Sequence, residues 1–123
     1  MCHQSVGLIA REVEAAGIPT LAMTSALDIT QAVKPPRSVF VDFPLGHQTG
    51  KPHQPDLQRQ IVRDALTAFE QIAKPGEIVK LPYVWDPEDR SWEERDYTPG
   101  FMAKRPGPEE ADGWDAQRIA RYR

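Results

Sequence analysis

Helix-like and strand-like segments alternate along the first 84 residues of this chain, and that alternation constrains the fold more than any other feature of the sequence. Apolar residues recur there either at helical spacing or in short continuous runs. The helical segments and the runs lie, in turn, at residues 4–16, 20–23, 26–33, 38–43, 55–72 and 78–84. Strands that alternate with helices pair in parallel, because each helix carries the chain back to the same end of the sheet. The pattern therefore predicts an α/β fold.

Local signals mark the ends of the first two helices. The apolar face of the first helix includes Val6 and Ile9, and Gly17 follows where a left-handed C-cap residue belongs. Ser25 and Asp28 have the spacing of a variant capping box, which predicts that Ser25 caps the second helix.

The predicted sheet is small and parallel, flanked by helices in a three-layer, Rossmann-like arrangement. Pro82 lies in the third strand, and proline in a strand indicates an edge position. Such a domain normally begins with a strand that leads into its first helix, whereas here the helical pattern begins almost at Met1. We therefore expect that a first strand is missing and that residues 1–85 are a fragment of an α/β domain.

Charge divides the chain into two parts. It holds 15 Lys and Arg against 18 Asp and Glu, for a net charge of −3. Residues 1–85 carry eight of each sign, whereas residues 86–123 carry ten acidic and seven basic residues. A nucleic-acid site needs a concentrated positive face, so the sequence predicts no nucleic-acid partner. Residues 86–123 are predicted to form an acidic, proline-rich tail whose aromatic residues pack on the body or on a partner, with a brief helix over 109–121.

The sequence shows no membrane span and no signal peptide, and this predicts the compartment of the protein. No apolar run approaches the ~20 residues of a membrane span, and no basic region followed by an apolar stretch marks a signal peptide. The single cysteine, Cys2, cannot form an internal disulfide. We expect a cytoplasmic protein with no membrane partner.

Polar residues gather where such a fold binds ligands. Helix N-termini and strand C-termini share one edge of a parallel α/β layer, and ligands bind along that edge. Three groups of residues are placed there: the start of the first helix, and the loops after the first and second strands. The candidate substrate-binding residues from these groups are Gln4, Ser5, Thr24, Ser25, Gly46 and Lys51.

Cys2 and His3 are the candidate reactive pair. A thiol at a helix N-terminus has its thiolate stabilised by the helix dipole and by free backbone amides, and a neighbouring histidine can add positive charge. The plainer alternative is that Cys2 is a small terminal residue with no chemical task.

The loop after the second strand supplies further candidates. His47 is a candidate acid or base, and Lys51 is either a partner for an anionic substrate group or an exposed lysine. Cys2, His3, His47 and His53 together suffice in number for zinc, but their spacing fits no zinc signature, so no metal is expected. Asp42, late in an apolar strand, either reaches the functional edge or bonds to a helix amide.

Several short stretches of the sequence resemble one known protein family. The stretch from Cys2 to Glu12 (CHQSVGLIARE), continuing from Glu14 to Thr20 (EAAGIPT), resembles the selenoprotein B family of glycine, sarcosine, betaine and D-proline reductases. Further matching stretches are Ser25-Ala26, Asp28-Ile29-Thr30, Pro35-Pro36-Arg37, Asp42 to His47 (DFPLGH) and Gly50-Lys51-Pro52. The resemblance covers roughly Cys2 to Trp85 and excludes the tail.

The resemblance implies a redox subunit that cleaves a carbon–nitrogen bond in an amino acid or betaine, with other reductase subunits or further copies of the chain as partners. In that family a selenocysteine or cysteine lies shortly before the position of Cys2, which makes Cys2 the resolving thiol. His47 would protonate the leaving amine. No bound cofactor is expected, apart from a selenocysteine encoded upstream of Met1.

A different class of function competes with this one. The chain can be a non-catalytic α/β binding module that keeps the fold and the edge that favours anions, while the tail docks a partner. The selectivity of Cys2 alkylation separates the two hypotheses, because only the reductase needs an activated thiol.

Overall fold

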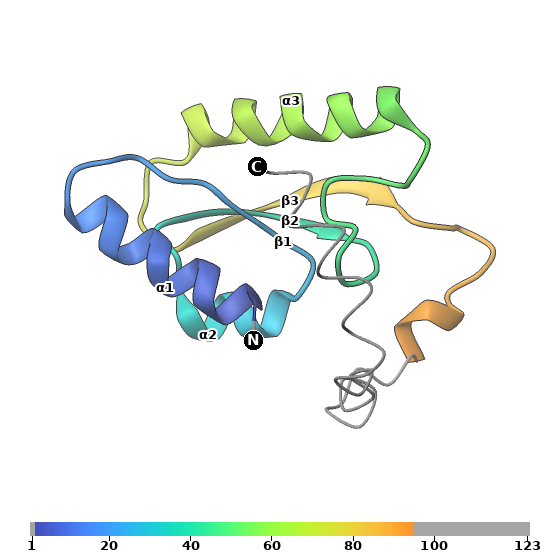
Figure 1. Ribbon diagram of the computed structural model, residues 1–123, viewed down its shortest axis with the longest axis horizontal. Helices are drawn as coiled ribbons and strands as arrows, with labels where there is room; N and C mark the ends of the chain where they lie inside the picture. Colours follow the sequence, from blue (N-terminus) through green and yellow to red (C-terminus); the bar gives the residue numbers. More distant parts are fainter. Residues whose placement is uncertain (1, 95–123) are drawn as a thin grey trace, which may run out of the picture. The chain divides into compact units, whose positions relative to one another are not determined.

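The computed structural model describes residues 2–94 (Figure 1), and the chain divides into two units, Met1–Arg90 and Ser91–Arg123. The described part of the second unit is one 3-10 helix, η1 (Ser91–Glu94). The helix predicted over 109–121 lies outside the described residues. The elements of the first unit are, in order, α1 (Cys2–Ala15), β1 (Ala22–Thr24), α2 (Leu27–Val33), β2 (Arg37–Asp42), α3 (Pro55–Gln71) and β3 (Glu77–Val84).

The three strands form one open parallel sheet in the order β1-β2-β3, which confirms the α/β prediction. The central strand β2 supplies Val39 and Val41, both completely buried. The outer strand β3 contains Pro82, so the prediction of an edge strand is correct. The ladder between β2 and β3 is irregular beside Pro82, where Phe40 pairs with Lys80 but Asp42 pairs with Val84. Proline has no N–H to donate, which suits it to this break in the ladder.

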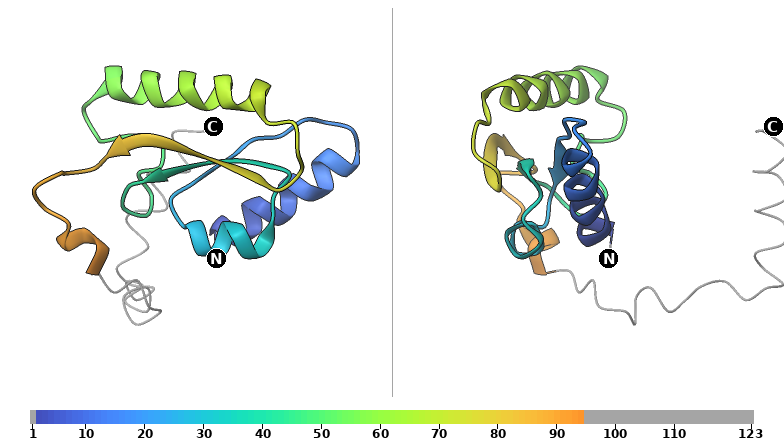
Figure 2. Two further views of the ribbon diagram at one scale, coloured as in Figure 1. Left: turned by 180° about the vertical axis from the view of Figure 1, so that it is seen from behind. Right: turned by 90° about the vertical axis from the view of Figure 1, so that its left-hand side faces the viewer.

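Helices cover both faces of the sheet (Figures 1 and 2). On one face α3 contacts β2 and β3, and Ala65 and Ala68 of the helix pack on Val39. A second cluster joins Ile61 of the same helix to Val41 and Phe43. On the other side α1 packs against α2 and β1. The small helix residues let α3 approach the sheet closely.

The first helix buries only part of the apolar stripe predicted for it, which comprised Val6, Ile9, Ala10, Val13 and Ala16. Its buried residues are Gly7 and Ala10, whereas Val6 and Ile9 are 48% and 61% exposed. The reason is the close approach of α2, whose Val33 lies against Gly7. The C-terminal signal was correct: Gly17 has φ 90°, and Ile18 N–H donates to Val13 O at 3.2 Å.

The predicted capping box of the second helix is wrong. The N-cap residue is Ala26, and it makes no side-chain cap hydrogen bond. Thr24 Oγ1 instead accepts the Ala26 N–H at 3.1 Å, and Thr30 Oγ1 donates to Ala26 O at 2.7 Å. The hydroxyls of the two threonines, 2.8 Å apart, thus fix the start of α2, and Ser25 is not needed there.

None of the helices within residues 2–94 has the length and apolar character needed to cross a membrane.

Candidate functional site

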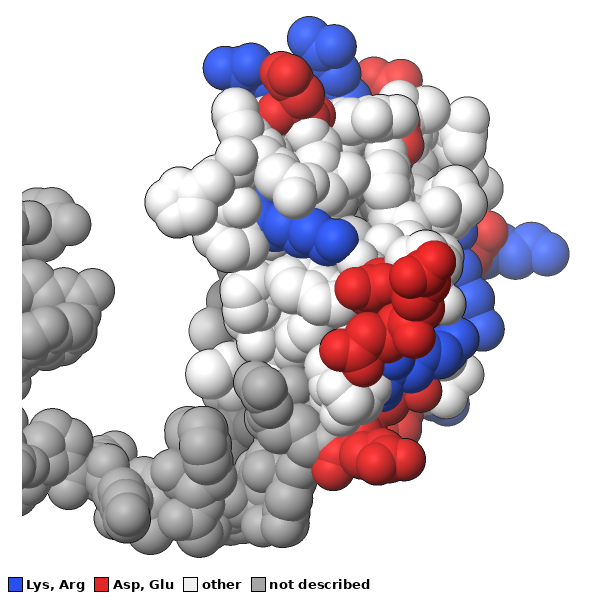
Figure 3. All heavy atoms as spheres, turned by 90° about the vertical axis from the view of Figure 1, so that its right-hand side faces the viewer, with Lys and Arg blue, Asp and Glu red and all other residues white. Residues whose placement is uncertain are grey.

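All three helices of the first unit begin at the edge of the sheet where the strands end (Figure 1), as the topology predicts. Figure 3 looks onto this edge and shows that uncharged side chains cover much of it. The edge therefore brings together residues from α1, from the turn after β1 and from the loop after β2. It is the place in the described chain where the candidate residues converge.

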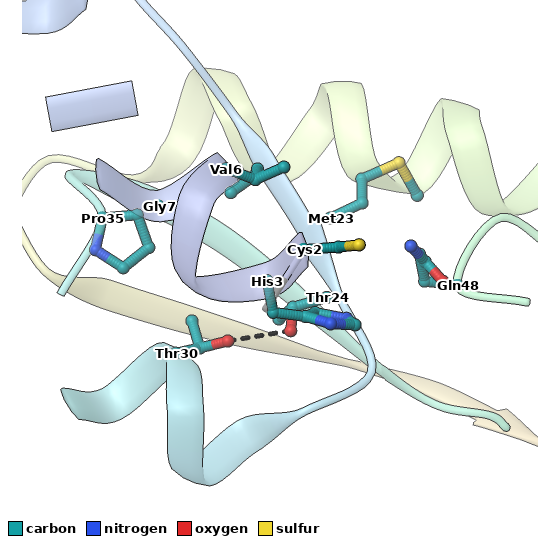
Figure 4. Close-up of a pocket in the computed structure, with 10 residues that line it drawn as sticks. Cys2, His3, Val6, Gly7, Met23, Thr24, Thr30, Pro35 and Gln48 are labelled. Atoms are coloured by element: carbon teal, nitrogen blue, oxygen red, sulfur yellow. Dashed lines mark hydrogen bonds between the residues drawn. The ribbon is translucent and has the colours of Figure 1, made fainter. Parts of the chain in front are cut away.

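A cavity of about 50 Å³ opens at this edge (Figure 4). A volume of this size admits a small chemical group, since one water needs roughly 10–15 Å³ by the same measure. Its walls come from α1, β1, α2 and the loop after β2. The lining residues are Cys2, His3, Val6, Gly7, Ala22, Met23, Thr24, Thr30, Pro35 and Gln48.

Cys2 is the first residue of α1, and its exposed thiol points into the cavity toward Gln48 (Figure 4). Free amides at the first turn and the positive end of the helix dipole favour a negative charge at this position. The thiol is thus set where thiolate chemistry on a ligand in the cavity is geometrically open to it.

His3 is held in its neutral form. Its Nε2 accepts the Ser25 N–H at 3.2 Å, which leaves the ring proton on Nδ1. Partial burial lowers the pKa of His3 below its usual 6.5, and the carboxylate of Asp28 only partly offsets this. The expectation that His3 adds positive charge beside Cys2 is therefore wrong at neutral pH, because burial disfavours the imidazolium.

The two hydroxyl residues at the end of β1, Thr24 and Ser25, differ in their hydrogen bonding. Thr24 Oγ1 is buried and engaged by Thr30 and Ala26. Ser25 Oγ is shielded from solvent and has no hydrogen-bond partner among the described residues. Thr24 thus holds the wall of the cavity together, while Ser25 keeps a free hydroxyl beside His3.

The loop after β2 places His47 and Lys51 around Trp85 rather than in the cavity. The ring centroids of His47 and Trp85 are 5.0 Å apart, and those of Phe43 and Trp85 are 5.2 Å apart. Lys51 Nζ lies 5.0 Å from the Trp85 ring centroid, within cation–π range. The two predicted residues therefore share the edge with Cys2, but they line a neighbouring aromatic cluster.

Three other predicted residues line neither feature. Gln4 and Ser5 are exposed in the first turn of α1. Gly46 is exposed with φ 89°, in a turn closed by His47 N–H donating to Pro44 O at 3.0 Å. The left-handed backbone conformation accounts for a glycine at position 46, so no ligand contact is needed to explain it.

Asp42 reaches the functional edge, one of the two alternatives left open by the sequence. Its side chain is 53% exposed and pairs with Arg90 at 3.7 Å. No group of three or more His, Cys, Asp or Glu within residues 2–94 is arranged to hold a metal ion. The set Cys2, His3, His47 and His53 accordingly does not assemble as a zinc site in this part of the chain.

Two residues that were not among the candidate site residues also lie at this edge. Gln48 lines the cavity opposite Cys2, and Trp85 is the ring that His47 and Lys51 share. Trp85 follows β3 directly, so the rule that strand ends meet at one edge would have placed it there. Nothing in the spacing of the loop distinguishes Gln48 from its polar neighbours.

Comparison with known proteins points to a reductase. No family model matches the chain, and no solved structure matches it. The chain is 34% identical over 82 residues, 67% of its length, to D-proline reductase subunit gamma of Acetoanaerobium sticklandii. The match spans 34% of that subunit, so the chain corresponds to about a third of the relative. The chain is thus distantly related to the reductase family of this subunit.

Proposed function

We propose that the chain is a redox subunit of a reductase of the glycine, sarcosine, betaine and D-proline type, which cleaves a carbon–nitrogen bond of a small amino acid or betaine. The observation that carries the proposal is the position of Cys2, at the amino end of α1 with its thiol directed into the cavity. The relation to D-proline reductase subunit gamma supports the same chemistry.

In the proposed reaction a second nucleophile, a selenol or thiol, attacks the substrate carbon that bears nitrogen. A carbon–selenium or carbon–sulfur bond forms, the carbon–nitrogen bond breaks, and the amine leaves with one proton. The thiolate of Cys2 then attacks that selenium or sulfur, and the electron pair of the broken bond passes to carbon, which takes up a proton. The substrate gains two electrons and two protons. The two nucleophiles become a selenosulfide or disulfide, which an external dithiol reduces.

Cys2 is the resolving thiol in this scheme, the role that the resemblance to the selenoprotein B family implies for its position. The first nucleophile is then a selenocysteine or cysteine supplied by another part of the enzyme. Neutral His3 donates a hydrogen bond from Nδ1 to the bound substrate. His47, predicted to protonate the leaving amine, lies in the Trp85 cluster, and we assign it and Lys51 to the outer part of the substrate site.

The proposed partners follow from the size of the match. The relative is a subunit of a larger enzyme by its name, and this chain corresponds to about a third of it. We propose that the chain acts together with other reductase subunits or with further copies of itself, and that the aromatic tail contributes to that contact.

The alkylation rate of Cys2 tests the proposal. With iodoacetamide at pH 7, the folded chain should react at least about tenfold faster than the same chain unfolded in guanidinium chloride, because only the folded thiol sits at a helix end. Cys2→Ser, which removes the single thiol, gives the background. Equal rates in the two states would remove the chemical basis for a reductase role.

The second candidate function is a binding module without catalysis. The small volume of the cavity favours it, because a site of about 50 Å³ holds only part of an amino acid. In that case the folded and unfolded chains would be alkylated equally fast, and the Cys2→Ser variant would bind the same ligands as the wild type.

A further inference from the structure

The two edges of the sheet differ in how they are protected against a further strand. Within residues 2–94 the order β1-β2-β3 leaves β1 and β3 each paired on one side only. β3 carries Lys80 and Pro82, two kinds of residue that discourage edge pairing. β1 has neither, and residues 15–27 around it hold no charged side chain. The sheet is therefore protected at β3 and open to pairing at β1.

On one face of the open edge, α1 carries apolar side chains that no other part of the described chain covers. The buried residues of α1 are Gly7 and Ala10, whereas Val6 and Ile9, three residues apart on one side of the helix, remain exposed. Val6 lines the cavity together with Met23 of β1, so this side of α1 borders the strand. Figure 2 shows α1 beside β1, at the end of the sheet away from β3.

On the other face, α3 leaves a second apolar strip exposed. Phe69 of α3 lies against Arg37, which bonds to Glu14 of α1, so this side of α3 is the one nearer to α1. Leu66 and Val62 precede Phe69 by three and seven residues, which places them on the same side of the helix. They are 56% and 40% exposed. Both helices thus leave apolar surface uncovered on the β1 side of the sheet.

The strand between these two strips is itself only partly covered. Leu21 and Met23 pack against the core formed by α3 and β2, yet both are only partly buried. Ala22, Met23 and Thr24 all line the cavity, although successive residues of a strand point to opposite faces. The cavity therefore runs along the open edge of β1. A strand paired at this edge would become one wall of the cavity.

We propose that the open edge of β1 binds an extended apolar segment of another polypeptide, which adds a fourth strand to the sheet between α1 and α3. A strand covered on both faces is a continuous apolar run, so the partner segment should have about five or six successive apolar residues. β1 is three residues long, so burial of side chains against the two helices contributes more than the few new backbone hydrogen bonds. The inference does not depend on the chemistry of Cys2.

Two other occupants fit this edge less well. Residues 95–123 contain no run of more than three apolar residues, the run from Phe101 to Ala103. A second copy related by a twofold axis would bring both α1 helices to one face of the joined sheet, at the junction where one α1 already lies against β1. A segment without a helix of its own avoids this crowding. The rest of a larger enzyme can supply it, since the chain corresponds to about a third of its relative.

A synthetic peptide tests the proposal on the full chain. It has six successive valine and isoleucine residues between pairs of lysines and carries fluorescein, whose anisotropy reports binding. The control peptide is N-methylated at all six apolar residues, so it keeps the side chains but has no N–H in that run to donate to the edge. We expect the control to bind at least about fivefold more weakly. The amides of residues 21–25 should exchange hydrogen more slowly when the first peptide is bound.

Variants of the two helices test the flanks of the edge. Ile9 and Leu66 are both more than half exposed, so Ile9→Gln and Leu66→Gln should keep the melting temperature of the wild type. Each should weaken binding of the first peptide about three- to tenfold, because apolar surface that the peptide would cover is lost. Leu8→Gln changes an exposed residue on another side of α1 and should leave the affinity unchanged.

Equal affinity of the two peptides, or no binding of either, would overturn the proposal. An equal loss of affinity in Leu8→Gln and Ile9→Gln would do so too, since the peptide would then adhere to apolar surface in general. If the chain sediments as a dimer, and Ile9→Gln and Leu66→Gln convert it into a monomer, a second copy occupies the edge of β1 and the proposed partner is wrong.

Discussion

At the scale of single residues, burial together with hydrogen bonds keeps two rings near the sheet in their neutral forms. His3 uses Nε2 to accept from the backbone of Ser25, so protonation of that nitrogen breaks a bond. Tyr83 uses its hydroxyl to donate to Asp64 Oδ2 at 2.5 Å, so loss of its proton breaks a bond as well. In both cases the folded chain favours the neutral form of the ring.

His3 should make the stability of the chain fall with acid. Its pKa is lowered in the folded state, chiefly by burial, so its contribution is complete above 6.5 and is lost as the pH falls through the lower folded value. We expect urea unfolding to show a smaller loss of free energy between pH 7.5 and 5.5 in His3→Asn than in the wild type. The exposed His53, changed to Asn, should behave like the wild type. An NMR titration of His3 with a midpoint above 6.5 would contradict this.

Tyr83 should make the stability fall in strong base. Partial burial and the hydrogen bond to Asp64 raise the pKa of Tyr83 to about 12. Its contribution is therefore complete below the usual value of 10.0 and is lost as the pH rises through about 12. Absorbance titration of the phenolate should show one late tyrosine, which disappears in Tyr83→Phe. If Asp64→Asn leaves the late titration unshifted, the carboxylate does not have this effect.

At the scale of elements, the contact between α1 and α2 depends on the absence of a side chain. A Cβ on Gly7 would lie 2.6 Å from Val33 Cγ1 and 3.8 Å from Pro35 Cβ. Valine is stiff at χ1, so its methyl group cannot turn away without cost. Both Gly7 and Pro35 line the cavity, and the fit of these helices therefore shapes the wall beside Cys2.

Gly7→Ala should destabilise the protein although alanine favours helices. The clash costs roughly 1–3 kcal/mol, and the gain in helix propensity recovers about 1 kcal/mol. We expect a net loss of about 1 kcal/mol in the free energy of unfolding, measured with urea. Adding Val33→Ala opens space for the new methyl group, so the loss caused by Gly7→Ala should vanish in that background. A loss of equal size in both backgrounds would mean that the clash is not its source.

At the scale of the first unit, one arginine joins three layers at the end of the sheet opposite the cavity. Arg37 begins β2, and its guanidinium donates to Glu14 of α1 at 2.9 Å. The same guanidinium lies 5.4 Å from the ring centroid of Phe69 in α3. Glu14 also accepts the Thr20 N–H at 2.9 Å, which fixes the chain before β1. A carboxylate from one face of the sheet and an aromatic ring from the other thus meet at a single residue.

A double-mutant cycle measures this link. Glu14 and Arg37 have side chains that are 18% and 30% exposed, so solvent weakens their pairing. We expect Glu14→Gln and Arg37→Met each to lower the free energy of unfolding, with a coupling of about 0.5–1 kcal/mol between them. The exposed pair of Arg59 with Asp56, at the start of α3, should give a smaller coupling because it is more exposed. A coupling near zero for Glu14 with Arg37 would show that the layers are joined by apolar packing alone.

The sequence by itself determined the order of helices and strands, the parallel sheet, the edge position of β3 and the edge on which Cys2 lies. These features follow from periodicity, from chain breakers and from the rule that strand ends meet helix starts, all of which act along the chain. Tertiary structure alone decided that Gly7 and not Val6 faces α2, that the hydroxyls of Thr24 and Thr30 and not that of Ser25 fix the start of α2, and that His3 is neutral. It also decided that His47 turns to Trp85 while Gln48 faces the thiol. Most of these depend on contacts between residues far apart in sequence, and neither composition nor spacing encodes which neighbour a side chain will meet.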